Sequence, residues 1–135
     1  MCIRDRLNDT HGHLAGDEVL KKLAWILKQE IRDVDLAARY GGEEFLVMLP
    51  DTNIDGAWEV GERIRARIEQ EKLAFDGTEI TVTASIGIAG GPVEGESAET
   101  LIGWADEALY EAKRAGRNRV VTAVRKKATP PTAES

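Results

Sequence analysis

Residues 36–49 read LAARYGGEEFLVML, two short apolar runs separated by two glycines and two glutamates. Each run, residues 36–40 and residues 45–49, has the length of a short strand. Because glycine tolerates positive φ, the Gly-Gly pair favours a tight reversal of the chain. These residues therefore predict a β-hairpin with two carboxylates at its tip.

Outward from this hairpin, apolar residues recur at steps of three and four in three segments, which is typical of amphipathic helices. The second helix is preceded by a capping box from Thr52 to Asp55, and Ser97 and Gly116 can cap the two ends of the third. Strict alternation indicates a half-buried strand in a fourth segment. The predicted elements are helices at 14–32, 53–71 and 97–116 and strands at 79–89 and 120–124. This order predicts an α+β fold, with helices packed on an antiparallel-rich sheet.

Composition limits the classes of function. The chain has 135 residues, 42% of them apolar, which suffices for one domain with a modest core. A net charge of −6 argues against binding a nucleic acid polymer, which needs a basic face. No apolar run approaches the ~18 residues of a membrane span, so we expect no membrane segment in this chain. Its single cysteine, Cys2, excludes an intrachain disulfide and favours a reducing, cytoplasmic setting.

The two glutamates of the hairpin, Glu43 and Glu44, are the first candidates for chemistry. Consecutive carboxylates at a turn offer hard oxygen ligands to Mg²⁺ and could accept the proton of an attacking hydroxyl. Gly41 and Gly42 would let a ligand approach the backbone closely. A solvated hairpin tip with two surface acids explains the same residues, and their spacing alone does not decide between the two interpretations.

A polar stretch, LNDTHGHLAGD at residues 7–17, leads into the first predicted helix. Across a loop of this kind Asn8 and Asp17 could converge and offer a donor and acceptors to a base edge such as that of guanine. The alternative is that both residues only cap and turn the chain. His11 and His13 are expected to be structural or surface residues, because two histidines this close in a loop indicate a metal site only weakly.

Charged residues also follow two of the predicted helices. Lys113 and Arg117 lie at the end of the third helix, where cations complement the helix dipole. The same two residues could clamp a phosphate, one as a point charge and the other as a planar fork. Arg32 and Asp35 follow the first helix, either as an ordinary helix end and turn or as a pair exposed to a second ligand.

Four of these stretches, taken together, closely resemble the GGDEF domain of bacterial diguanylate cyclases. They are residues 7–17, RYGGEEF at 39–45, VTASIGIA at 82–89 and ADEALYEAKRAGRN at 105–118. Each stretch alone is a weak signal. Four of them in the right order, within a match that covers about residues 7–124, are a specific one.

The resemblance implies a palm-like α+β fold, similar to that of nucleotide cyclase catalytic domains. It also implies that two GTP molecules condense to cyclic di-GMP with loss of two pyrophosphates. Each domain of a homodimer would hold one GTP, and the 3′-hydroxyl of one would attack the α-phosphate of the other. Mg²⁺ or Mn²⁺ is the implied cofactor, and the metal ions explain how an acidic chain can bind a polyanion.

The resemblance also assigns roles to individual residues. The positions that match substrate contacts are Asn8, Asp17, Gly41, Gly42, Lys113 and Arg117. The first two match the pair that binds guanine, and the other four match positions near the phosphates. Glu43 matches a metal ligand, and Glu44 matches a second catalytic acid. The positions that match an inhibitory site for the product are Arg32, Asp35 and Arg63.

The ends of the chain depart from this pattern. The family carries an aspartate-bearing strand just before the Asn-Asp segment, and the letters MCIRDR at residues 1–6 do not supply it. We therefore expect a non-native start at residues 1–6, a missing first strand and impaired activity of the chain as given. We expect the catalytic domain at residues 7–124 and a disordered tail at residues 125–135. The parent protein could be membrane-anchored through a preceding region.

Two alternatives to an active cyclase stay open. A domain of this kind could bind GTP or cyclic di-GMP without catalysis, which a parent sequence without the metal-binding aspartate would favour. A nucleotide cyclase with another base preference would require Asn8 and Asp17 to accept adenine equally well, which competition between nucleotides would reveal.

Overall fold

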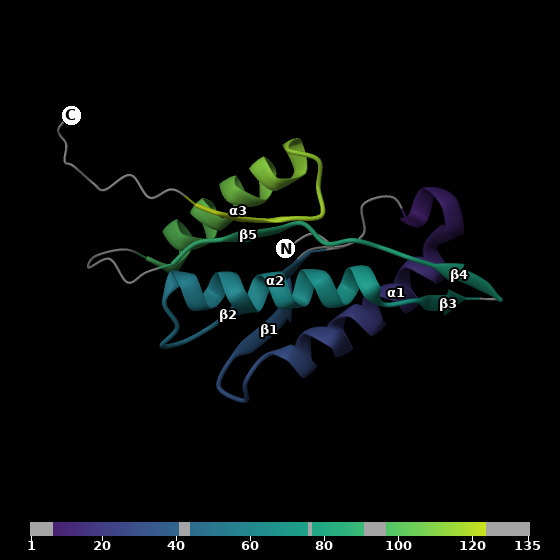
Figure 1. The fold of residues 1–135 in the computed structure, drawn as a ribbon, viewed down its shortest axis with the longest axis horizontal. Coiled ribbons are helices and arrows are strands. Elements are labelled where there is room, and N and C mark those ends of the chain that lie inside the picture. Colours follow the sequence, from purple (N-terminus) through teal and green to yellow (C-terminus); the bar gives the residue numbers. More distant parts are fainter. Residues whose placement is uncertain (1–6, 41–43, 76, 91–96, 124–135) are drawn as a thin grey trace.

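The structure is a computed structural model that describes residues 7–40, 44–75, 77–90 and 97–123, so the predicted start and tail lie outside it (Figure 1). The helices are α1 (Leu7–Glu30), α2 (Ile54–Gln70) and α3 (Ala98–Arg114). The strands are β1 (Leu36–Arg39), β2 (Phe45–Met48), β3 (Leu73–Phe75), β4 (Thr78–Ile80), β5 (Ile86–Ile88) and β6 (Val120–Thr122). The predicted α+β class is confirmed.

The strands of the described residues form three two-stranded sheets. β1 and β2 pair antiparallel with Leu36 opposite Met48, which confirms the predicted hairpin. β3 and β4 form a second antiparallel hairpin that the sequence did not predict, with Gly77 of its turn at φ 79°. β5 and β6 pair parallel, with Ile86 opposite Val120, because α3 forms a crossover between them. The strands are therefore less continuous and less uniformly antiparallel than we expected.

Helix α1 begins at Leu7, whereas the sequence predicted a loop up to Leu14. Gly12 and Gly16 each cost about 1 kcal/mol in a helix interior, so the local sequence does not favour this extension. The helix is anchored further along, where the apolar face of residues 19–27 is buried as predicted. Because extending an existing helix is much easier than nucleating one, that anchored part can carry the polar residues before it. No helix in the described part of the chain is long and apolar enough to cross a membrane.

Side-chain caps begin the other two helices. The Asn53 side-chain oxygen accepts a hydrogen bond of 2.8 Å from the N–H of Gly56, so α2 is capped at Asn53. The sequence placed this cap one residue earlier, at Thr52, and that detail was wrong. The Ser97 hydroxyl accepts a hydrogen bond of 3.1 Å from the N–H of Thr100, which confirms the predicted cap of α3.

The core lies between the helices and the strands. α1 packs on α2, α2 packs on β5 and β6, and α3 packs on β5 from the other side (Figure 1). The largest apolar side chains with less than 2% exposure are Leu23, Ile26, Leu27 and Ile68. The α1 stripe that the sequence predicted thus forms a central part of the core.

β5 is covered on both faces, although its alternation predicted a half-buried strand with one face open to solvent. Ile86 and Ile88 face α2 at Gly61. On the opposite face Ser85 is fully buried, and Gly87 lies directly against α3. That face holds small residues because a helix backbone, and not solvent, lies on it.

Replacing Gly87 by alanine should destabilise the fold by about 3 kcal/mol or more, at the upper end of overpacking effects. Its Cβ would lie 2.2 Å from the carbonyl oxygen of Ala105, so α3 would have to move. At Gly103 on the same helix a Cβ would meet no atom within 4 Å, and alanine there should stabilise by about 0.5–1 kcal/mol. Urea unfolding of both variants measures these changes, and an unchanged midpoint for Gly87→Ala would contradict the packing of α3 on β5.

Candidate active site

The predicted catalytic acids lie at the tip of the β1–β2 hairpin. Three residues of this tip are outside the described part of the chain: Gly41, Gly42 and Glu43. The Glu44 carbonyl accepts a hydrogen bond of 2.8 Å from the N–H of Tyr40, which closes the hairpin beside the tip. Glu44 is half buried and the following Phe45 lies in the core, so the base of the acidic turn is firmly anchored. The catalytic roles of the two acids stay predictions.

The predicted guanine pair, Asn8 and Asp17, lies on one helix. The prediction that they converge across a polar loop is therefore wrong. Nine residues along a helix correspond to a separation of roughly 13 Å between Asn8 and Asp17, measured along the helix axis. The Asp17 side chain is exposed, and those of Asn8, His11 and His13 lie outside the described part. Binding of guanine by this pair stays a prediction that rests on the resemblance.

Arg32 and Asp35 form a tightly bonded pair just after α1. Arg32 Nη2 donates to Asp35 Oδ1 at 2.8 Å, and the Arg32 N–H donates to Oδ2 at 2.8 Å. The Asp35 side chain is only 2% exposed, whereas that of Arg32 is 54% exposed. The hydrogen bond from Arg32 lowers the pKa of Asp35, and the same contact raises the pKa of Arg32. Both groups are therefore charged near neutral pH, and part of the guanidinium faces solvent.

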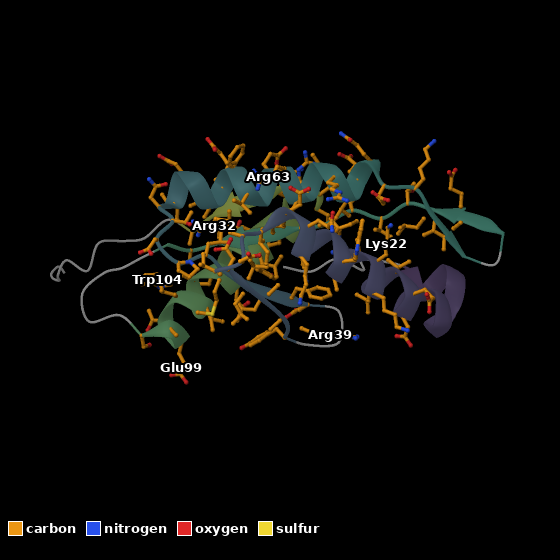
Figure 2. The ribbon with its side chains drawn as sticks, turned by 90° about the horizontal axis from the view of Figure 1, so that it is seen from below. Lys22, Arg32, Arg39, Arg63, Glu99 and Trp104 are labelled. Atoms are coloured by element: carbon orange, nitrogen blue, oxygen red, sulfur yellow. The ribbon has the colours of Figure 1, made fainter. Side chains whose placement is uncertain are left out.

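Arg63 reaches from α2 to the end of α1. Its Nε donates to Glu30 Oε1 at 2.7 Å, and its Nη2 donates to the Glu30 carbonyl at 3.0 Å. Arg67 donates to the other carboxylate oxygen at 2.8 Å. The structure thus brings the three predicted product-site residues to the same end of α1, and Figure 2 shows Arg32 and Arg63 on that side of the molecule.

Glu30 is a residue of this region that the sequence analysis missed. Burial would raise its pKa, but hydrogen bonds from Arg67 and Arg63 and their charges hold the pKa below its ordinary value. A carboxylate in the last turn of a helix opposes the helix dipole. This unfavourable position of Glu30 in the sequence could have indicated that cations from elsewhere in the chain bind its carboxylate.

Lys113 and Arg117 flank the end of α3. The N–H of Arg117 donates to the Ala112 carbonyl at 2.9 Å, and the N–H of Gly116 donates to the Lys113 carbonyl at 3.3 Å. These two bonds form a Schellman motif, and Gly116 has a φ of 121°. The predicted cap of α3 at Gly116 is confirmed, and the motif brings both predicted phosphate contacts to one helix end.

The two groups of cations occupy different places. Arg32 follows α1, which packs on α2, whereas Arg117 follows α3, which packs on β5 (Figure 1).

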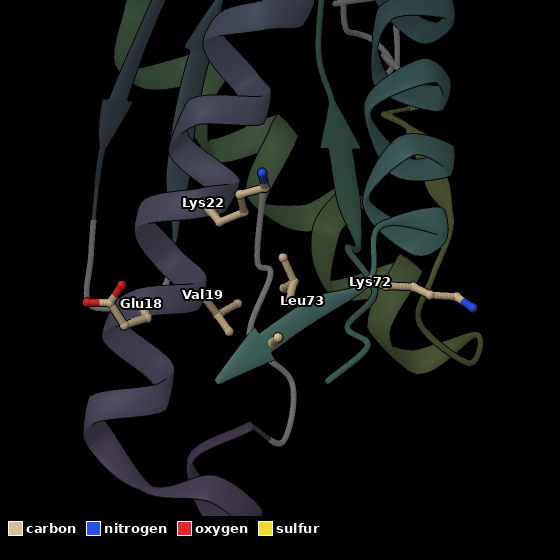
Figure 3. Close-up of a pocket in the computed structure, with 6 residues that line it drawn as sticks. Glu18, Val19, Lys22, Lys72 and Leu73 are labelled. Atoms are coloured by element: carbon tan, nitrogen blue, oxygen red, sulfur yellow. The ribbon is translucent and has the colours of Figure 1, made fainter. Parts of the chain in front are cut away.

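A separate hollow of about 280 Å³ lies between α1 and β3 (Figure 3). Its lining residues are Glu18, Val19, Lys22, Lys72, Leu73 and Ala74. The ammonium groups of Lys22 and Lys72 point in different directions, so the charged groups do not converge on one position. The hollow therefore offers no arrangement that favours a charged ligand.

The predicted metal ligand, Glu43, is one of the two acids of the hairpin. Within the described ranges, no three side chains of His, Cys, Asp or Glu are grouped to hold a metal ion. Mg²⁺ commonly takes one or two protein carboxylates and completes its shell with substrate phosphates and water. Adjacent carboxylates at Glu43 and Glu44 fit that donor set.

The sequence profile of the family described as "Diguanylate cyclase, GGDEF domain" matches residues 5–119. This chain belongs to the GGDEF family. Diguanylate cyclase A of Treponema denticola is 51% identical to it over 114 residues, which are 84% of this chain and 31% of that protein. The response regulator PleD of Caulobacter vibrioides is 44% identical over 118 residues, which are 86% of this chain and 26% of PleD. The chain thus spans about a third or less of the length of these relatives.

Solved GGDEF structures have the same fold. The GGDEF domain of DgcB from Caulobacter crescentus, in complex with c-di-GMP, superposes with a TM-score of 0.84 at 35% identity, over 90% of this chain and 74% of that one. The active GGEEF domain of a diguanylate cyclase from Vibrio cholerae superposes with a TM-score of 0.81 at 31% identity, over 93% of this chain and 80% of that one. The same GGEEF letters stand at residues 41–45 of the present GGDEF domain.

The Glu30 contacts predict a pH-dependent difference in stability between the wild type and Glu30→Gln. Since the folded pKa of Glu30 lies below its ordinary value of 4.5, its contribution is present above that pH. It is lost as the pH falls through the folded pKa, because the carboxylate is then protonated. We expect Glu30→Gln to lower the free energy of unfolding by about 1 kcal/mol at pH 7. In acid the unfolding free energies of the variant and the wild type should become equal.

Urea unfolding between pH 7 and pH 3 measures this difference. Glu18→Gln is the matched control, because Glu18 is well exposed and lies 3.7 Å from Lys21 in a weak surface pair. A Glu30→Gln deficit that is equal at all pH values would show that the ionised carboxylate is not what stabilises the end of α1.

Proposed function

We propose that this GGDEF domain, placed at residues 7–124, condenses two GTP molecules to cyclic di-GMP and two pyrophosphates across a homodimer. The observation that carries the proposal is the complete GGEEF sequence motif at residues 41–45, in a chain matched by the family profile over residues 5–119. The relatives named diguanylate cyclases support the same activity. Guanine is the expected base because Asn8 and Asp17 occupy the matching positions.

The residues of the chain divide the work by charge. Lys113 and Arg117 would hold phosphate oxygens, since a point charge and a planar fork suit a polyphosphate. Glu43 would hold Mg²⁺ or Mn²⁺, which neutralises phosphate charge when bound. Glu44, the residue after Glu43, would orient the attacking 3′-hydroxyl or accept its proton. Gly41 and Gly42, which have no side chains, would let the phosphates approach the backbone.

Arg32, Asp35 and Arg63 form the proposed inhibitory site for cyclic di-GMP. Arg32 is already oriented by Asp35 and still half exposed, so it can meet a phosphate or a guanine edge without first being ordered. Arg32 lies just after α1, whereas Lys113 lies at the end of α3, and a site apart from the phosphate contacts suits a regulatory role. A supply of GTP places this activity in the cytoplasm.

The second candidate function is binding of GTP or cyclic di-GMP without turnover. The preformed Arg32–Asp35 pair favours it, because such a pair can recognise the product whether or not the catalytic acids act. Catalysis and binding are separable by experiment, since only catalysis needs the acids of the hairpin.

The catalytic proposal predicts Mg²⁺-dependent turnover of GTP to cyclic di-GMP, measured by chromatography of the products, at the impaired rate that the sequence analysis leads us to expect of the chain as given. Glu43→Gln should lower kcat by about 100-fold or more, because a neutral amide holds the metal ion poorly. Glu79→Gln is the matched control, because Glu79 is an exposed acid on β4. Binding of cyclic di-GMP without any turnover by the wild type would establish the second candidate instead.

The inhibitory-site proposal predicts that Arg32→Ala weakens inhibition by added cyclic di-GMP about tenfold, because a charge-assisted contact is lost. The initial rate without product should stay close to that of the wild type. Arg114→Ala, at an exposed arginine of α3, should leave inhibition unchanged. Equal inhibition of all three proteins would place the product elsewhere.

A further inference from the structure

The loop between α3 and β6 has an unusual backbone at two consecutive residues. Arg117 has a φ of 66° and Asn118 a φ of 50°, and neither is glycine. Residues with a Cβ rarely adopt this left-handed conformation, although asparagine tolerates it better than arginine does. Such a conformation persists only where its surroundings hold it. The contacts of Asn118 therefore bear directly on how Arg117 is placed.

Backbone contacts tie the loop to β5. The N–H of Asn118 donates to the hydroxyl of Ser85 at 3.2 Å, and Ser85 is fully buried. The Arg119 carbonyl accepts a hydrogen bond of 3.0 Å from the N–H of Ile86. These bonds fix the residues that follow Arg117, just as the Schellman motif fixes the residues before it.

Side-chain contacts tie the same loop to α2. Asn118 Nδ2 donates to Glu69 Oε2 at 2.8 Å, and Asn118 Oδ1 accepts from Arg65 Nη1 at 2.9 Å. Arg65 also donates to Glu69 Oε1 at 3.0 Å and, through Nε, to Glu62 Oε1 at 2.8 Å. Both ends of the Asn118 amide are thus held by α2.

The charges of this cluster keep it intact near neutral pH. The Arg65 side chain is only 16% exposed, and its hydrogen bond with Glu62 raises its already high pKa further. The hydrogen bond from Asn118, with that from Arg65, lowers the pKa of Glu69. Arg65 contacts three partners at once through the planar fork of its guanidinium, which a lysine cannot do.

We propose that Asn118 and Arg65 are positioning residues for nucleotide binding, which hold Arg117 in its left-handed turn so that its guanidinium meets the GTP phosphates beside Lys113. The inference rests on the proposed function. It adds a role for α2, which supplies Arg65 and Glu69 to hold the loop. A cation that is held in place before the ligand arrives loses less conformational freedom on binding. The contacts of Asn118 with Arg65 and Glu69 would therefore raise the affinity for GTP.

The test measures GTP affinity by calorimetry with Mg²⁺, together with KM and kcat for cyclic di-GMP formation. Asn118→Ala, Asn118→Gly and Arg65→Lys should each weaken GTP binding about tenfold, mainly through KM. Asn118→Gly separates two effects, because glycine keeps the left-handed backbone accessible but removes the amide. Wild-type affinity in Asn118→Gly would overturn the role of the side chain. Arg114→Lys is the matched control for Arg65→Lys and should change neither constant.

A double-variant comparison separates positioning from general stability. If Asn118 acts through Arg117, Asn118→Ala should weaken GTP binding in the wild type but have no further effect on an Arg117→Ala background. Its effect on the melting temperature should be similar in both backgrounds. Equal losses of affinity in the two backgrounds would overturn the inference.

The failure of the proposed function has a different signature. A wild type that neither binds nor turns over GTP, or unchanged GTP affinity in Arg117→Ala, would remove the phosphate role itself. A wild type that binds GTP through Arg117, with unaffected Asn118 and Arg65 variants, would overturn only the positioning role.

Discussion

The contact between α3 and β5 is the constraint on which most of this structure depends. Gly87 has no side chain, and the backbone of α3 at Ala105 occupies the space where a Cβ would lie. The opposite face of β5 packs on α2 through Ile86 and Ile88. A strand enclosed in this way fixes where α3 ends, and the chain can then return as β6, parallel to β5. The end of α3 is where the proposed phosphate contacts lie.

The charged residues assigned to ligand binding lie near the ends of the helices. The chain has a net charge of −6, and two of the cations assigned to ligands, Arg32 and Arg63, are held by acids from the same chain. Asp35 orients Arg32, and Glu30 holds Arg63. Glu69 accepts a hydrogen bond from the side chain of Asn118, beside Arg117. These hydrogen-bonded contacts differ from exposed pairs, which contribute little because solvent screens them. An arginine held by a buried or half-buried carboxylate keeps a defined direction, which matters more for recognition than the pair contributes to stability.

The sequence predicted elements well wherever one residue type has one dominant physical role. The apolar stripe of α1, the Ser97 cap and the Gly116 cap were all predicted, because each follows from local periodicity or backbone chemistry. The predictions failed where a distant segment decides the outcome. The start of α1 was placed too late, since its polar residues do not reveal the anchored helix that extends through them. The β3–β4 hairpin was missed, as its three-residue strands carry too little pattern.

The sequence by itself determined the family, the α+β class and the residues on which the proposed chemistry rests, because motifs and periodicity are local properties of the chain. Only the tertiary structure decided that β5 is covered on both faces, since α3, which covers Gly87, comes later in the chain. It also decided that Arg65 and Glu69 hold Asn118. About fifty residues separate these partners, and no local pattern records which side chains meet once α2 and the α3–β6 loop have packed on β5.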